Sequence, residues 1–121
     1  MVRGIRGAIT VKNNTDQAIR ESTCQLLAKI VEQNNIELGQ IVSVIFSATK
    51  DLDAETPAYG ARLMGWPSIP LFCTLEMEVP NTLTKCIRVL LHINTDKSQE
   101  DIQHIYLEGA KVLRPDLTEG A

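Results

Sequence analysis

Four segments of the chain have the spacing of apolar positions that is typical of β-strands. They are residues 2–11, 41–48, 71–79 and 85–94. The segment 41–48 is apolar on both faces and rich in β-branched residues, which predicts a strand that is covered above and below and lies centrally in a sheet. A turn at Pro80, Asn81 and Thr82 separates the last two segments.

The segment 15–35 repeats its apolar residues at the spacing of an α-helix. Asn14 or Thr15 suits the N-cap, Asp16 suits the first turn, and Asn34 with Asn35 suits a left-handed stop. The pattern therefore predicts one long helix. Its inward face carries Ile19, Thr23, Leu26, Leu27, Ile30 and Val31.

A second, shorter helix is predicted in the middle of the chain. Thr56 followed by Pro57 is typical of an N-cap and a first helical position, and Gly65 is a suitable stop. Such a helix displays Tyr59 and Arg62 on its surface.

The C-terminal part of the chain gives weaker signals. Ser98 with Asp101 is a capping pattern for a short helix, whereas residues 104–107 fit either its continuation or a last strand. The tail after Pro115 is expected to be mobile.

These elements predict an α+β fold in which a mixed β-sheet packs on one long helix. One helix can cover only one face of the sheet, yet the strand 85–94 has no plainly solvated face. One of its sides carries Ile87, Val89, Leu91 and Ile93, and the other carries Cys86, Arg88, Leu90 and His92. We therefore expect a second copy of the chain to cover the free face in a closed, symmetric oligomer.

The composition is that of an ordinary globular protein. The 121 residues are 44% hydrophobic and 22% charged, which fits a single domain over residues 1–121. A net charge of -3 and an aromatic content of 4% argue against nucleic acid as a partner, because phosphate binding needs clustered cations and base stacking needs rings. No apolar run approaches the roughly 18 residues of a membrane span, so we expect a cytoplasmic protein without a membrane partner. The cysteines, Cys24, Cys73 and Cys86, form no metal motif, so we expect reduced thiols and no metal.

Arg88 is the most informative single residue, because an unpaired guanidinium in the middle of a strand is strongly unfavourable. It needs an anionic partner, and the sequence leaves an internal glutamate and a bound ligand equally open. Glu76 raises the same question in the preceding strand segment, although an isolated acid on a sheet more often lies at the rim.

Other polar residues have an ordinary explanation beside a functional one. Arg6 has room to reach out beside Gly4 and Ala8, or is a solvated arginine, and Tyr106 is either a hydrogen-bond donor or a core aromatic residue. Motifs for nucleotide, metal and serine-hydrolase sites are absent from the sequence. The arginines, one acid and one tyrosine suit the binding of a small dianion. Surface or structural roles are the default for Arg62, Arg114, His92 and His104.

Five short motifs occur together in order: Arg-Gly-Ile-Arg-Gly-Ala at 3–8, Ser-Ala-Thr-Lys-Asp-Leu at 47–52, Cys-Ile-Arg-Val at 86–89, Tyr-Leu-Glu at 106–108 and Val-Leu-Arg-Pro-Asp-Leu at 112–117. In this combination the chain resembles the monofunctional chorismate mutases of the trimeric, pseudo-α/β-barrel type, from residue 2 to about residue 117. The resemblance implies a homotrimer with active sites between adjacent subunits. It also implies the rearrangement of chorismate to prephenate, in phenylalanine and tyrosine biosynthesis, without a cofactor or a covalent intermediate.

The resemblance further implies roles for individual residues. Arg88 would stabilise the negative charge that develops on the ether oxygen, and Glu76 would accept a hydrogen bond from the ring hydroxyl. Arg6 would bind a substrate carboxylate, and Tyr106 would donate a hydrogen bond in the same region. Further substrate contacts are implied for Arg62 of a neighbouring subunit and Arg114, which would hold the second carboxylate, and for Cys73, Tyr59 and Leu113.

The chain departs from the pattern of this family around the short helix. Thr56 and Tyr59 stand where an aromatic residue and a lysine are expected, and Phe72 stands where a smaller polar residue is expected. These positions lie at the implied cleft entrance, so the departures bear on substrate affinity more than on chemistry. Cys73 and Glu76 differ in strand parity, which predicts that they lie on opposite faces and belong to two different clefts.

Two alternative functions remain open at this point. One is a trimeric sensor that binds carboxylated metabolites with the same arginines and does no chemistry. The other is an imine or enamine deaminase on the similar barrel of other small trimeric proteins. Glu76 and Tyr106 distinguish a mutase from a sensor, because only the mutase needs both to orient its substrate.

Overall fold

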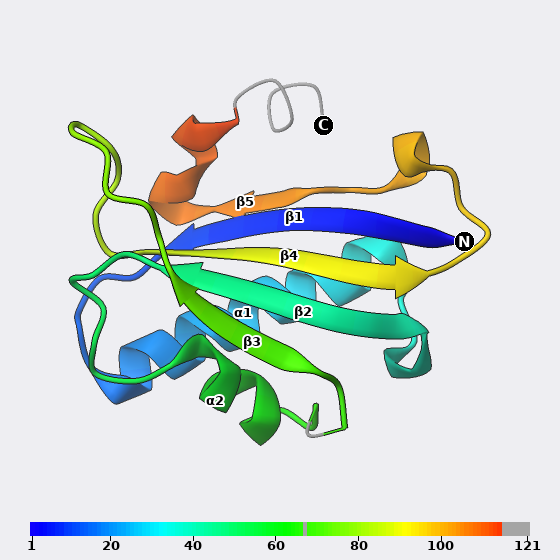
Figure 1. The fold of residues 1–121 in the computed structure, drawn as a ribbon, viewed down its shortest axis with the longest axis horizontal. Helices are drawn as coiled ribbons and strands as arrows, with labels where there is room; N and C mark the ends of the chain where they lie inside the picture. Colours follow the sequence, from blue (N-terminus) through cyan, green and yellow to red (C-terminus); the bar gives the residue numbers. More distant parts are fainter. Residues whose placement is uncertain (67, 115–121) are drawn as a thin grey trace.

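The fold is built on a mixed sheet of five strands. The computed structural model describes residues 1–66 and 68–114, and it orders the strands β3-β2-β4-β1-β5. The central strand β4 pairs antiparallel with β1 and β2, whereas the outer strands β5 and β3 pair parallel with β1 and β2 (Figure 1). The strand bounds are Val2–Thr10 for β1, Ile41–Ala48 for β2, Leu71–Leu75 for β3, Cys86–Asn94 for β4 and Ile105–Leu107 for β5.

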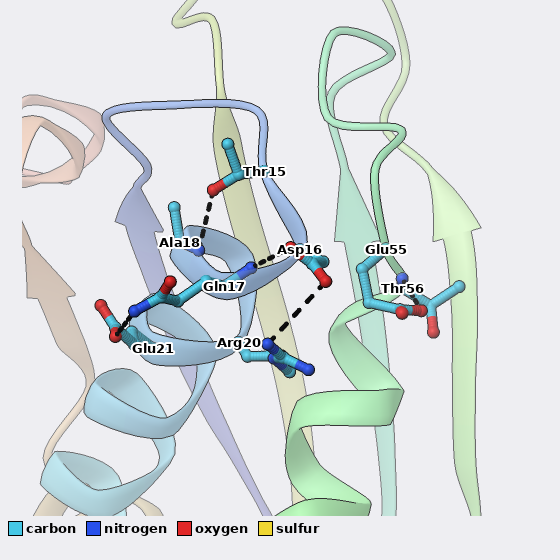
Figure 2. Close-up of polar contacts among 8 residues, drawn as sticks. All are labelled: Thr15, Asp16, Gln17, Ala18, Arg20, Glu21, Glu55 and Thr56. Carbon is cyan, nitrogen blue, oxygen red and sulfur yellow. Dashed lines mark hydrogen bonds and ion pairs between the residues drawn. The ribbon is translucent and has the colours of Figure 1, made fainter.

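Helix α1 spans Asp16–Asn34, inside the segment that the sequence predicts to be helical. Oγ1 of Thr15 accepts a hydrogen bond from the backbone N–H of Ala18 at 3.1 Å, as an N-cap residue does (Figure 2). Asn35 ends the helix in the left-handed conformation, with φ 50°. The buried residues of α1 are Ile19, Thr23, Leu26, Leu27, Ile30 and Asn34, and Val31 is partly buried.

Helix α2 (Pro57–Leu63) packs beside α1 on the same side of the sheet (Figure 1). Thr56 takes the N-cap position without a side-chain hydrogen bond, and Gly65 follows the helix with φ 101°. The core lies between this helical layer and one face of the sheet. Its largest fully buried side chains include Trp66, Phe46, Ile30 and Leu91.

Neither helix covers the opposite face of the sheet, which we call the open face. Val42 and Ile45 of β2 are 45% and 38% exposed, and Leu90 of β4 is 37% exposed. The expectation that β2 is covered on both faces is therefore wrong for a single chain, but β2 is an interior strand, with β3 and β4 on its two sides. An exposed apolar face of this kind is typical of a surface that meets a partner.

Strand β3 ends at Leu75, so the strand predicted over residues 71–79 is too long. In the described sheet β3 is an edge strand beside β2, and β2 ends at Ala48, which pairs with Leu75. The backbone N–H of Glu76 donates a last hydrogen bond to the carbonyl of Ala48 at 2.9 Å. Beyond it β2 offers no further backbone to pair with, and residues 76–79 run as irregular chain.

The C-terminal part adds β5 and two short 3-10 helices. Gln99–Asp101 follows the predicted cap Ser98, whose Oγ donates to Oδ2 of Asp101 at 3.0 Å. Residues 105–107 form strand β5, which settles the ambiguous segment, and Glu108–Leu113 form the last 3-10 helix. The tail from residue 115, expected to be mobile, lies outside the described residues. Within the described part of the chain, no helix is both long and apolar enough to cross a membrane.

Candidate active site

Arg88 and Glu76 form an ion pair on the open face. Nε of Arg88 lies 3.2 Å from Oε2 of Glu76, and the two side chains are 42% and 26% exposed. Nε itself is buried and has no partner with hydrogen-bond geometry among the described residues. Within the chain, the partner of Arg88 is therefore a glutamate, one of the two alternatives that the sequence left open. Much of the Arg88 side chain stays accessible to a ligand.

Glu76 is held in place from two directions. Its backbone N–H is bonded to Ala48, and its Oε2 accepts a hydrogen bond from Oγ of Ser47 at 2.6 Å. Ser47 pairs with Arg88 across β2 and β4, and Ala8 pairs with Arg88 across β1 and β4. Three adjacent strands therefore bring a hydroxyl, a guanidinium and a small residue to one place on the open face.

A small apolar cluster lies beside this ion pair. It consists of Ala8, Cys86, Tyr106 and Ala110, with Leu83 and Leu113 packed against it. Burial raises the pKa of the Cys86 thiol to about 11, and the charge of Arg88 opposes this shift. Cys86 is therefore a neutral thiol at neutral pH, and the cluster places Tyr106 and Leu113 on the same part of the face as Arg88.

Arg6, His104 and Arg114 lie near one another beside β5. Nδ1 of His104 accepts a hydrogen bond from the backbone N–H of Arg6 at 2.9 Å. This bond extends the parallel pairing that begins at Gly7 and Ile105. Burial lowers the pKa of His104, and the charges of Arg6 and Arg114 lower it further. The neutral ring that can accept this bond is thus the favoured form.

Tyr59, Arg62 and Cys73 form a separate group, which we call the helix-side group. The guanidinium carbon of Arg62 lies 5.9 Å from the centre of the Tyr59 ring, within the range of a cation–π contact. Cys73 is partly buried against the core. Burial raises the pKa of its thiol, and a hydrogen bond with the backbone of Ala58 and the charge of Arg62 oppose the shift. Cys73 therefore faces α2.

The helix-side group and the Arg88–Glu76 pair lie on opposite faces of the sheet. Cys73 pairs in register with Phe46, which is fully buried in the core. Glu76 instead bonds to Ser47, the next residue of β2, whose side chain points to the other face. Cys73 and Glu76 are thus on opposite sides, as their parity predicts. A single chain does not gather all of the predicted site residues into one cleft.

The residues that share the open face with Arg88 make up a second set, which we call the open-face group. It consists of Arg6, Glu76, Arg88 and Tyr106. Arg6 belongs to it because Arg6 and Ala8 are two residues apart on β1 and so point to the same face. Leu113 adjoins the group through the apolar cluster, and Arg114 adjoins it beside His104.

A groove of about 730 Å³ opens beside Glu76. Residues 49–51 and 75–84 line it, and Lys50 forms an ion pair with Glu78 at 2.9 Å along its wall. The exposed side chains of Leu75, Met77 and Val79 make the rest of the lining partly apolar. The groove therefore borders Glu76, whose side chain is 26% exposed.

Sequence reasoning did not assign site roles to Ser47 and His104. Ser47 is one of two serines in a mostly apolar strand, and its contact with Glu76 depends on the register of β2 against β3, which no local pattern reveals. His104 is structural, as predicted, but it holds the backbone of a candidate site residue. Within residues 1–66 and 68–114, no three His, Cys, Asp or Glu side chains lie close enough together to hold a metal ion.

Comparison with known proteins gives a consistent result. The family model for chorismate mutase type I matches residues 2–117. The chain is 48% identical to chorismate mutase AroH of Bacillus subtilis, over 98% of this chain and 94% of that protein. It is 47% identical to AroH of Thermus thermophilus, over 97% of each chain. A solved chorismate mutase from Clostridium thermocellum matches with a TM-score of 0.88 and 53% identity, over 90% of this chain and 97% of that one. The chain belongs to the chorismate mutase type I family.

Proposed function

We propose that the protein converts chorismate to prephenate at sites that neighbouring protomers of a homotrimer form together. The observation that carries this proposal is the Arg88–Glu76 pair: an accessible guanidinium beside an accessible carboxylate, on a face that one chain leaves uncovered. Membership of the family supports the reaction, because the relatives from two bacteria bear the name of this activity. It also disfavours the deaminase alternative.

The reaction asks little of a protein beyond shape and charge. Within one molecule an ether C–O bond breaks while a C–C bond forms, so no second substrate has to be brought in. Negative charge develops on the ether oxygen as its bond lengthens. A cation placed there stabilises the transition state more than the ground state. Arg88 is suited to this role, because the Glu76 carboxylate already restrains its guanidinium.

The other open-face residues would hold the substrate in its compact, reactive conformation. Arg6 would bind one carboxylate, and the hydroxyl of Tyr106 would donate a hydrogen bond in the same region. Glu76 would accept a hydrogen bond from the ring hydroxyl. Arg114 and Leu113 would close the site from the C-terminal segment. Concentrating arginines here is consistent with a dianionic substrate in a protein of net charge -3.

The helix-side group would act in the site of the neighbouring protomer. Arg62 would supply a cation for the second carboxylate, with Tyr59 and Cys73 lining the same wall. Two observations support this arrangement: the two groups lie on opposite faces of one chain, and Val42, Ile45 and Leu90 leave the open face apolar and exposed. A head-to-tail contact that closes into a ring of three would join the two groups and form the implied pseudo-α/β barrel.

The first experiment is an activity assay. Purified protein is mixed with chorismate, the fall in ultraviolet absorbance is followed, and prephenate is identified after acid converts it to phenylpyruvate. We expect saturable conversion that disappears in the Arg88→Ala variant. Absence of conversion by folded wild-type protein that still binds carboxylated metabolites in a calorimeter would favour the sensor alternative.

The second experiment tests whether the site is shared. Light scattering at micromolar concentration should give the mass of a trimer. Arg62→Ala and Arg88→Ala chains, each inactive alone, should regain activity when unfolded and refolded together, because some interfaces then contain both native arginines. The matched control combines Arg88→Ala with Glu76→Ala, which belong to the same face and should not complement. A monomer mass, or no difference between the two mixtures, would contradict the shared site. The cytoplasmic location stays a prediction.

A further inference from the structure

Oε2 of Glu76 has two polar neighbours of different character. Oγ of Ser47 donates a hydrogen bond to it at 2.6 Å, and Nε of Arg88 lies 3.2 Å away. The contact with Nε lacks hydrogen-bond geometry, since Nε has no such partner among the described residues. In the described part of the chain, Ser47 is thus the group that gives the Glu76 carboxylate a directional contact.

Glu76 needs such a contact because its backbone alone does not fix its carboxylate. The residue follows β3 directly and is anchored to Ala48 by its backbone N–H. Three side-chain torsions still separate this anchor from the carboxylate, and the last of them is broad. Ser47, in contrast, lies within a paired strand, with Thr74 on one side and Arg88 on the other. The pairing therefore fixes its backbone, and a single side-chain torsion separates that backbone from the hydroxyl.

We propose that Ser47 is a positioning residue for Glu76. Its hydroxyl engages Oε2 and so directs Oε1 toward the ring hydroxyl of the substrate. This inference rests on the proposed function, in which Glu76 accepts that hydrogen bond. Ser47 acts through Glu76 and does not contact the substrate. The first residue of the Ser-Ala-Thr-Lys-Asp-Leu motif thereby gains a role in the site.

The direct test is the kinetics of Ser47→Ala. We expect kcat/KM to fall about tenfold, as for the loss of one hydrogen bond to a charged group in a partly exposed place. Ser47→Thr keeps the hydroxyl and suits a strand, so it should stay within about threefold of wild type. Ser43→Ala is the matched control: Ser43 also lies on β2, but its Oγ is 3.1 Å from Nδ1 of His92 rather than near Glu76. It should leave kcat/KM unchanged.

A double-mutant cycle separates positioning from a general effect on the strand. Once Glu76→Ala has removed the carboxylate, Ser47→Ala should have almost no further effect on kcat/KM. If Ser47→Ala behaves like wild type, or if it lowers kcat/KM equally with and without the Glu76 carboxylate, the inference is wrong. The proposed function survives either result, because wild-type conversion of chorismate tests it separately.

The same cycle measured by urea unfolding does not depend on activity. The midpoint shifts of Ser47→Ala and Glu76→Ala should be smaller in combination than their sum, because both remove one contact. Fully additive shifts would overturn the pairing of Ser47 with Glu76 even in a protein that converts no chorismate. Non-additive shifts in such a protein would confirm the pairing of Ser47 with Glu76. The missing conversion of chorismate would then refute the proposed function alone.

Discussion

Nε of Arg88 and Oε2 of Glu76 lie 3.2 Å apart, although Arg88 belongs to the central strand and Glu76 follows an edge strand. Their side chains are 42% and 26% exposed, and ion pairs in such partly solvated places contribute little to the stability of a fold. We propose instead that the pair prepares a charge for a ligand. An arginine held by a neighbouring carboxylate loses less conformational entropy when it binds a substrate.

Replacing Arg88 should therefore separate activity from stability. We expect Arg88→Ala to lower kcat by more than about 100-fold, which corresponds to about 3 kcal/mol of lost transition-state stabilisation. Arg88→Lys should lose much of this rate as well, because an ammonium lacks the planar fork of a guanidinium. The free energy of unfolding should change by less than about 1 kcal/mol in both variants. Near-normal turnover in either variant would refute the role of Arg88.

The sequence could predict this part of the site only as separate residues. Arg88 attracts attention because it is a charge within an apolar strand, and Glu76 because it follows one. Their contact depends on the strand order β3-β2-β4, which places Ser47 between them. Pairing between distant strands is not encoded in any local spacing. In contrast, α1 begins and ends as predicted, because caps and helical periodicity are local signals.

The two faces of β2 illustrate a second limit of prediction from the sequence. Its apolar residues on both faces predict a strand covered above and below, but the single chain covers only the side of Val44 and Phe46. The pattern is consistent with a trimer in which a neighbouring copy packs on Val42 and Ile45. Apolar positions in a sequence include those that become buried only when copies of the chain assemble. The helices and strands of one chain show only which of these positions that chain can cover by itself.

Tyr59→Lys should change apparent KM more than kcat. Tyr59 contacts Arg62 on the helix side and has no contact with the Arg88–Glu76 pair, so it is expected to influence substrate binding rather than bond breaking. A lysine places a second cation beside Arg62, where a substrate carboxylate is proposed to bind. Steady-state kinetics give both constants, and Tyr59→Phe, which keeps the ring face, is the control. A large fall in kcat at constant KM would contradict this reading.

Gly7→Ala should destabilise the fold by about 1–3 kcal/mol, the usual cost of overpacking a core. A Cβ at Gly7 would lie 2.9 Å from Cδ1 of Ile30 and 3.1 Å from the carbonyl oxygen of Ile105, and the latter is backbone that cannot move aside easily. Urea unfolding measures the change. Gly39→Ala is the control, because a Cβ there meets nothing within 4 Å. Equal stabilities of the two variants would contradict the expected overpacking at Gly7.

His104 should make stability depend on pH in the acid range. Its pKa in the native protein is lowered from 6.5 by burial and by the charges of Arg6 and Arg114. Below about pH 6.5 the unfolded chain therefore takes up a proton that the native chain resists, so the free energy of unfolding should fall as the pH falls toward the native pKa. Protonation also removes the acceptor for the backbone N–H of Arg6.

His104→Asn tests this contribution, because an amide oxygen can accept the hydrogen bond from Arg6 but does not titrate in this range. Urea unfolding of wild type and variant at pH 8.0 and at pH 5.0 gives the free energy of unfolding in each condition. We expect the wild type to lose more stability than the His104→Asn variant between these two conditions. An equal loss in wild type and His104→Asn would assign the acid sensitivity to other groups.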